Sequence, residues 1–230
     1  MPNSEWLFIL TEYTALISTA ISGTIVAIER RLDMIGVWFL ALVSSFGGGV
    51  LRDVLLGDVP PRFFTNYHWL LVVTLVSMAV FCLARFWRGW WKASIRTYTE
   101  QINNILDAVG LAAFTLSGVQ LACAAGYEGN PFLCVFMGTI TGIGGGVLRD
   151  ISVMQTPRVF RKRVYAVASI LGGVLYWGML HFELSDELTW TISMVVIIGI
   201  RVCATVFRWN MPSVPIPEDQ SEQEKEMIKK

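Results

Sequence analysis

The chain has 230 residues, of which 54% are apolar and 16% charged, and its formal net charge is zero. Soluble domains carry about 25% charged residues, so the composition excludes an ordinary soluble domain and predicts a polytopic helical membrane protein. A neutral chain without a basic stripe gives no reason to expect nucleic acid as a partner.

Seven apolar tracts follow one another along the chain, separated by short loops that hold most of the charges. A helix needs about 20 apolar residues to cross a bilayer, and each tract approaches that length. The predicted spans lie at about residues 6–28, 34–56, 67–87, 102–124, 131–154, 163–182 and 187–207.

Positively charged loops mark the cytoplasmic side of a membrane protein. If the N-terminus lies on one side, the other side receives Arg30 and Arg31, the basic residues between 85 and 96, the run Arg161–Arg163 and the lysines of the tail. The first side receives little besides Arg62. We therefore expect a multi-pass protein of the cell (inner) membrane with its N-terminus outside and its C-terminus in the cytoplasm.

One heptapeptide, GGGVLRD, occurs at Gly47–Asp53 and again at Gly144–Asp150. PPRFF follows the first copy and TPRVF the second, and a Ser-Gly pair precedes the copies at Ser22 and Ser117. The duplicated unit contains three spans, so the second copy must enter the membrane from the opposite side. Inverted repeats of this kind are typical of transport proteins.

The predicted fold class is thus an all-α membrane protein with two inverted three-helix repeats and a seventh helix. The predicted organisation is a first repeat over 1–88, a cytoplasmic linker over 89–101, a second repeat over 102–182, the seventh helix within 183–207 and a polar cytoplasmic tail over 208–230.

The glycine triplets lie roughly 20 Å into the second and fifth spans at a rise of 1.5 Å per residue. Glycines there can kink a helix and free carbonyls, which are tolerated only inside protein or along a water-filled cavity and suit a desolvating cation. Close helix packing on small residues is the simpler and compatible interpretation. The expected pathway-lining residues are Gly47, Gly48, Gly49, Gly144, Gly145, Gly146, Ser45 and Thr141.

Charged side chains within spans are costly and usually face a bundle interior or water. Here they are expected to be mouth charges that concentrate cations, with interfacial ion pairs and solvated helix ends as the alternatives. The predicted mouth charges are Arg52, Asp53, Arg149, Asp150, Glu12 and Asp107. Arg201, in the seventh span, can either snorkel to the interface or pair with a carboxylate.

The remaining polar chemistry of the sequence is sparse. Four cysteines fall inside spans without CxxC spacing and are expected to be buried apolar filler rather than disulfide or metal ligands: Cys82, Cys123, Cys134 and Cys203. The sequence contains no recognisable nucleophile–base pair, metal-ligand cluster or phosphate-binding loop. It predicts neither an enzyme nor a cofactor.

The doubled GGGVLRD, the PPRF and TPRV segments and the 3+3+1 plan of spans resemble the trimeric intracellular cation (TRIC) channel family. The resemblance is to its bacterial branch, also catalogued as a glycine-transporter domain family. It implies a homotrimer in contact with membrane lipids. It also implies an ion pathway in each protomer, formed by spans 1, 2, 4 and 5 with glycine-kinked spans 2 and 5. Eukaryotic members carry a lysine, linked to lipid and gating, at the place comparable to Arg52.

The predicted function is a monovalent cation channel, permeable to K⁺ and Na⁺, with its pore between the second and fifth helices. A secondary transporter for glycine or another small neutral solute is the alternative, because alternating access suits the same inverted repeat. A purely structural membrane oligomer is a third possibility. The sequence has no selectivity-filter string like TVGYG, so weak selectivity is expected.

Overall fold

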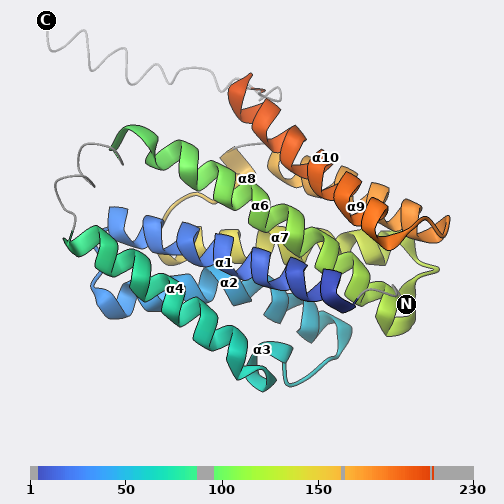
Figure 1. The fold of residues 1–230 in the computed structure, drawn as a ribbon, viewed down its shortest axis with the longest axis horizontal. Coiled ribbons are helices and arrows are strands. Elements are labelled where there is room, and N and C mark those ends of the chain that lie inside the picture. Colours follow the sequence, from blue (N-terminus) through green and yellow to red (C-terminus); the bar gives the residue numbers. More distant parts are fainter. Residues whose placement is uncertain (1–4, 87–95, 162–163, 208, 210–230) are drawn as a thin grey trace, which may run out of the picture.

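A computed structural model describes residues 5–86, 96–161, 164–207 and 209. Every regular element in those residues is helical (Figure 1): α1 (Glu5–Glu29), α2 (Met34–Leu56), α3 (Arg62–Thr65), α4 (Tyr67–Phe86), α6 (Arg96–Ala122), the π-helical turn η2 (Cys123–Tyr127), α7 (Pro131–Ser152), α8 (Arg158–Arg161), α9 (Val164–His181) and α10 (Asp186–Val206). In the described part of the chain, seven helices are long and apolar enough to cross a membrane, and the predicted all-α membrane class is confirmed.

The helix bounds lie within a few residues of the predicted ones, apart from two features. Helix α6 begins at Arg96, inside the stretch assigned to the linker. Two four-residue helices that were not predicted, α3 and α8, begin at the arginines of PPRFF and TPRVF. Residues 89–95 of the predicted linker, and the predicted tail except Trp209, lie outside the described residues.

Helices α2 and α7 begin in the same way. Asp33 accepts a hydrogen bond from the Gly36 amide at 2.7 Å, and Asn130 accepts one from the Leu133 amide at 3.1 Å. A side-chain acceptor at this position satisfies a backbone donor that the first turn leaves free. Both caps stand the same number of residues before their triplets, so the duplication extends to the helix starts.

The contacts between helices repeat in the two halves of the chain. Helix α1 packs on α6, and α2 packs on α7. The third long helix of each half covers the first two of that half: α4 packs on α1 and α2, and α9 packs on α6 and α7. Helices α1 (blue) and α6 (green) run in opposite directions in Figure 1, as an inverted repeat requires. Helix α10 is added against α9 and α6.

Helices α2 and α7 stay α-helical through both triplets. Among the described glycines, positive φ is confined to Gly57 and Gly126. The expected release of backbone carbonyls at the triplets is therefore not observed, and the kinks stay a prediction. The irregular backbone lies instead at the end of α6, in the turn η2, where Gly126 has a φ of 92°.

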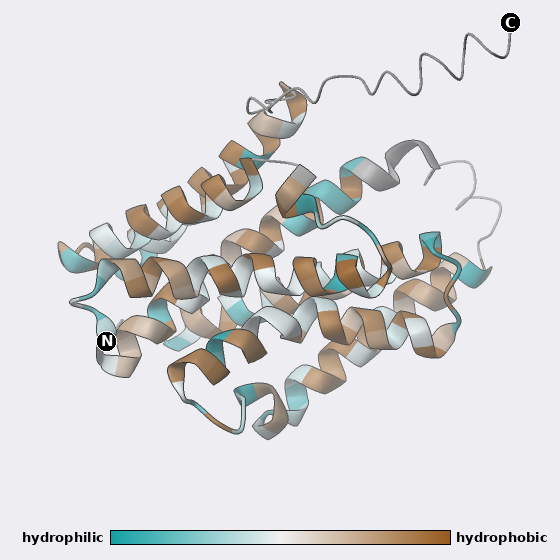
Figure 2. Ribbon diagram, turned by 180° about the vertical axis from the view of Figure 1, so that it is seen from behind, coloured by the Kyte–Doolittle hydropathy of each residue, from teal (hydrophilic) through white to brown (hydrophobic). Residues whose placement is uncertain are grey.

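The distribution of side chains is that of a protein in an apolar solvent. Leu71, Leu75 and Leu83 of α4 are each more than half exposed, whereas Arg149 and Arg201 are almost fully buried. Figure 2 shows apolar residues along most of the length of the helices and hydrophilic ones mainly at the loops and helix ends. Lipid can cover the leucines, but it cannot solvate a guanidinium, so the interior must supply polar partners.

Candidate functional site

The centre of the bundle is the crossing of α2 and α7, where the two glycine triplets meet. A Cβ atom on Gly48 would collide with the carbonyl oxygen of Thr141, and one on Gly145 would collide with the carbonyl oxygen of Ser44. A Cβ on Gly144 would lie 3.0 Å from the Cα of Gly48. Small residues let membrane helices approach this closely, so the packing interpretation holds for these glycines.

The third glycine of each triplet has a different environment. The nearest atom to a Cβ on Gly49 would be Nη2 of Arg52 at 3.6 Å, and a Cβ on Gly146 would meet the Tyr165 hydroxyl at 3.4 Å. Gly49 and Ser45 border a cavity of about 20 Å³, room for roughly one water molecule. Thr141 instead packs at the close contact of α7 with Gly118 on α6.

A first buried cluster lies beside this cavity. Nη2 of Arg52 forms an ion pair with Oδ1 of Asp53 at 2.8 Å, and Nη1 donates to the Ser117 hydroxyl at 3.4 Å. Ser117 in turn donates to the Glu12 carboxylate. Glu12, Arg52 and Asp53 are each at most 4% exposed.

A second buried cluster contains the residues at the matching places of the repeat. Arg149 forms an ion pair with Asp150 at 2.9 Å and another with Asp107 at 3.1 Å. Its Nη1 also donates to the hydroxyl of Ser22 at 2.9 Å. Ser22 donates to the amide oxygen of Asn103.

The serines connect the two halves reciprocally. Arg52 of the first half contacts Ser117 of the second, and Arg149 of the second half contacts Ser22 of the first. Each cluster therefore contains residues from both repeats. The Ser-Gly pairs that the sequence comparison aligned supply these bonds, although they were not among the predicted site residues.

The aspartates of the two motifs also position the loops that follow. Oδ2 of Asp53 accepts a hydrogen bond from the backbone N–H of Arg62 at 2.9 Å, and Oδ2 of Asp150 accepts one from the N–H of Arg158 at 2.9 Å. Each carboxylate thus binds a guanidinium with one oxygen and the start of a short helix with the other. This geometry explains why Arg-Asp and a later Pro-Arg occur together in both copies.

The second cluster contains more positively charged side chains than the first. Asp107 has two further cationic neighbours in addition to its ion pair with Arg149. Its Oδ1 lies 3.8 Å from Nη1 of Arg158, and its Oδ2 lies 3.8 Å from Nη2 of Arg201. Arg201 also lies over the Tyr165 ring at 4.3 Å, a favourable cation–π geometry. Glu12, at the matching place in the first cluster, has the Ser117 hydroxyl as its hydrogen-bond partner. Of the two alternatives for Arg201, pairing with a carboxylate is the observed one.

The structure places the six predicted mouth charges inside the bundle, on either side of the glycine crossing. All six are buried, so none of them is a solvated helix end in this structure, and their role as mouth charges stays a prediction. Arg158, Arg201 and Tyr165 complete the second cluster but were not predicted as site residues. The matched PPRFF and TPRVF segments were the signal for Arg158, whereas nothing in the repeat points to residues of α10.

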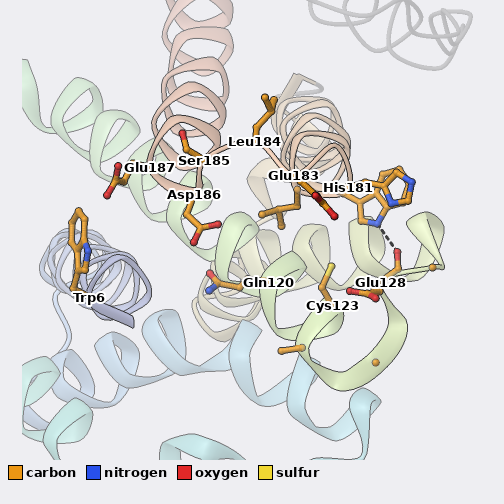
Figure 3. Close-up of a pocket in the computed structure, with 15 residues that line it drawn as sticks. Trp6, Gln120, Cys123, Glu128, His181, Glu183, Leu184, Ser185, Asp186 and Glu187 are labelled. Atoms are coloured by element: carbon orange, nitrogen blue, oxygen red, sulfur yellow. Dashed lines mark hydrogen bonds between the residues drawn. The ribbon is translucent and has the colours of Figure 1, made fainter. Parts of the chain in front are cut away.

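A larger pocket of about 1250 Å³ opens at one end of the bundle, where α6 and α9 end and α10 begins (Figure 3). Its rim carries Glu128, Glu183, Asp186 and Glu187. Of the cysteines, Cys134 is buried as predicted, Cys123 is half-buried at this pocket, and Cys82 and Cys203 are exposed. The filler prediction is thus wrong for the two exposed thiols, which are on the outside of α4 and α10.

The fold is similar to that of several solved structures. A structure described as showing conductance through TRIC cation channels is 29% identical, with a TM-score of 0.78, over 92% of this chain and 99% of that one. A TRIC channel orthologue from Rhodobacter sphaeroides is 26% identical, with a TM-score of 0.79, over 88% and 98%. The protein class is therefore a seven-helix membrane protein with the TRIC channel fold, and these likenesses confirm the prediction that it is not an enzyme.

Relatives that are similar in sequence show the family to which the chain belongs. The inner membrane protein YadS of Escherichia coli, of the UPF0126 group, is 34% identical over 87% of this chain and 92% of its own length. The UPF0126 membrane protein YvgT of Bacillus subtilis is 31% identical over 89% and 95%. A family model described as glycine transporter matches twice, at residues 9–85 and 104–181. The chain belongs to this family, and each match covers one of the two repeats.

Proposed function

We propose that this chain is a cation channel of the inner membrane, permeable to K⁺ and Na⁺, that assembles as a homotrimer with one ion pathway in each protomer. The proposal rests on the two clusters of buried charged residues, one on either side of the α2–α7 crossing. Charged residues within membrane spans are rare, and they mark ion or substrate pathways often enough to make a pathway the default hypothesis. The likeness to solved TRIC cation channels supports the same conclusion.

The proposed pathway runs beside the glycine crossing rather than through it. The space beside Gly48 and the space beside Gly145 are occupied by backbone atoms of the facing helix, so no gap for an ion remains between the two helices at these glycines. Gly49 and Gly146 face Arg52 and the Tyr165 hydroxyl instead. We therefore place the pathway along the third glycine of each triplet, bounded by α1, α2, α6 and α7, with one cluster on each side.

The described conformation is closed in this proposal. The cavity next to Gly49 holds roughly one water, which is too little for a continuous ion path. The guanidinium of Arg149 sits against the Asp107 carboxylate, where a permeating cation would also bind. Opening then requires the arginine to leave its carboxylate, so that K⁺ or Na⁺ takes its place. The orientation we propose has the N-terminus outside and the C-terminus in the cytoplasm, with lipids around the apolar helices.

The test is K⁺ release from proteoliposomes, measured together with a membrane-potential dye. We expect electrogenic release from the wild type. Gly49→Leu should reduce it strongly because the side chain fills the small cavity. Gly178→Leu on α9 is the matched control, since a Cβ there meets no atom within 4 Å, and it should conduct like the wild type. No cation current from folded wild-type protein at any voltage would overturn the proposal.

A secondary transporter for glycine is the alternative that the description of the matching family model names, but the likeness to TRIC cation channels does not favour it. It predicts saturable uptake of labelled glycine that depends on a proton or sodium gradient. Uptake without electrogenic K⁺ release would establish the transporter and reject the channel. K⁺ release without glycine uptake would do the reverse.

A further inference from the structure

Two thiols are in contact at one end of the bundle. Sγ of Cys123, in the turn η2, lies 3.5 Å from Sγ of Cys134, in the first turns of α7. The Cys134 thiol also donates to the carbonyl oxygen of Tyr127 at 3.1 Å. Both thiols are free in this structure. A bond between them would join the end of α6 to the start of α7.

The backbone between these cysteines is irregular. Cys123 begins a π-helical turn, and Gly126 within it has a φ of 92°. Helix α7 starts at Pro131, with Asn130 as its cap. A disulfide requires the two sulfurs to approach to about 2.05 Å, so the Sγ atoms, now 3.5 Å apart, would have to move closer.

One thiol of the pair, Cys123, is accessible, whereas Cys134 is buried behind it. Cys123 lines the 1250 Å³ pocket, where Figure 3 places it between Gln120 and Glu128. This end of the bundle carries the acidic rim and the start of α1, whereas Arg30 and Arg31 follow α1 at its other end. By the positive-inside rule it faces away from the cytoplasm. Disulfides form and persist on that side of a bacterial membrane.

We propose that Cys123 and Cys134 form a disulfide in the mature protein. Each thiol loses its proton, the two sulfurs bond, and two electrons pass to the disulfide of a thiol–disulfide oxidoreductase, which leaves as a dithiol. The bond joins the helix that carries Ser117 to the helix that carries the second glycine triplet. The proposal depends on the membrane orientation and not on ion conduction.

The experiment is differential labelling of the full chain in cells. Thiols are trapped with acid and alkylated with one maleimide, then the protein is reduced, alkylated with a second maleimide and digested for mass spectrometry. We expect Cys123 and Cys134 to carry the second label and, after cleavage at Glu128 between them, to occur in one disulfide-linked peptide pair before reduction. Cys82 and Cys203 should carry the first label. A first label on both Cys123 and Cys134 would overturn the proposal, as would a crosslink to either exposed cysteine.

Two variants control the labelling. Cys82→Ser/Cys203→Ser should leave the pair oxidised, and Cys123→Ser should leave Cys134 with the first label. A second measurement is the melting temperature of purified protein before and after reduction. It should fall on reduction in the wild type and stay constant in Cys123→Ser. An equal response of the two proteins to reduction would reject a disulfide that joins these helices.

Discussion

Arg149 donates a hydrogen bond to the hydroxyl of Ser22 at 2.9 Å, across 127 residues of sequence. The bond joins the second repeat to the first, and Arg52 makes the matching bond to Ser117. Because each half supplies a hydroxyl to the arginine of the other, neither half completes its own cluster. The two repeats therefore form one cooperative unit, and the duplicated motif stabilises the interface between them.

The glycine crossing gives a first prediction about stability. Gly48→Ala should destabilise the protein by about 1–3 kcal/mol or more, because the new methyl group meets the Thr141 carbonyl. Gly49→Ala is the neighbouring control and should be nearly neutral, since its Cβ has 3.6 Å to Arg52. Thermal unfolding in detergent would measure both. Equal melting temperatures for the two variants would contradict the packing role of Gly48.

The second cluster predicts unequal effects of two buried arginines. Arg149→Gln leaves Asp107 and Asp150 without their closest cation and should cost about 3–5 kcal/mol. Arg201→Gln should cost clearly less, because Arg149 remains 3.1 Å from Asp107. Denaturant titration of the two purified variants would rank them. A larger loss for Arg201→Gln would show that α10, rather than the repeat interface, holds the cluster together.

Glu12 provides a prediction about ionic strength. It is buried at 4% exposure, so salt screens it weakly. If the pathway passes this carboxylate, Glu12→Gln should reduce K⁺ flux by a similar factor at low and high salt. Glu183→Gln, on the exposed rim of the large pocket, should have an effect that shrinks as salt rises. The measurement is flux across a salt series, and a strongly salt-dependent Glu12→Gln effect would place that residue at an open mouth.

The aspartates predict local changes in the loops. Asp53→Asn cannot accept from both Arg52 and the Arg62 N–H, because one oxygen becomes an NH₂ group. Amide hydrogen exchange should therefore increase in residues 58–65. Asp150→Asn should have the same effect on residues 154–160 and little on 58–65. Exchange that rises in both loops in either variant would mean that the bond positions the whole bundle rather than its own loop.

Membrane spans and the duplication could be read from sequence because they depend on local composition. About 20 apolar residues can be counted along the chain, and a repeated heptapeptide needs no three-dimensional information. The contacts of Arg201 could not be predicted in this way. Its partner Asp107 is on another helix, and neither residue's neighbours in sequence indicate the pair.

Hydropathy and repetition along the chain are enough to predict seven spans and two copies of one unit, with charges and glycines at matching places. The contacts that those residues make depend on how the helices pack against one another. Gly48 and Gly145 allow α2 and α7 to pack closely, because a backbone carbonyl of the facing helix lies where a side chain would otherwise be. Arg52 and Arg149 reach serines of the other half of the chain because α2 contacts α6 and α7 contacts α1. Side-chain partners depend on which helices touch, and hydropathy along one chain does not contain that information.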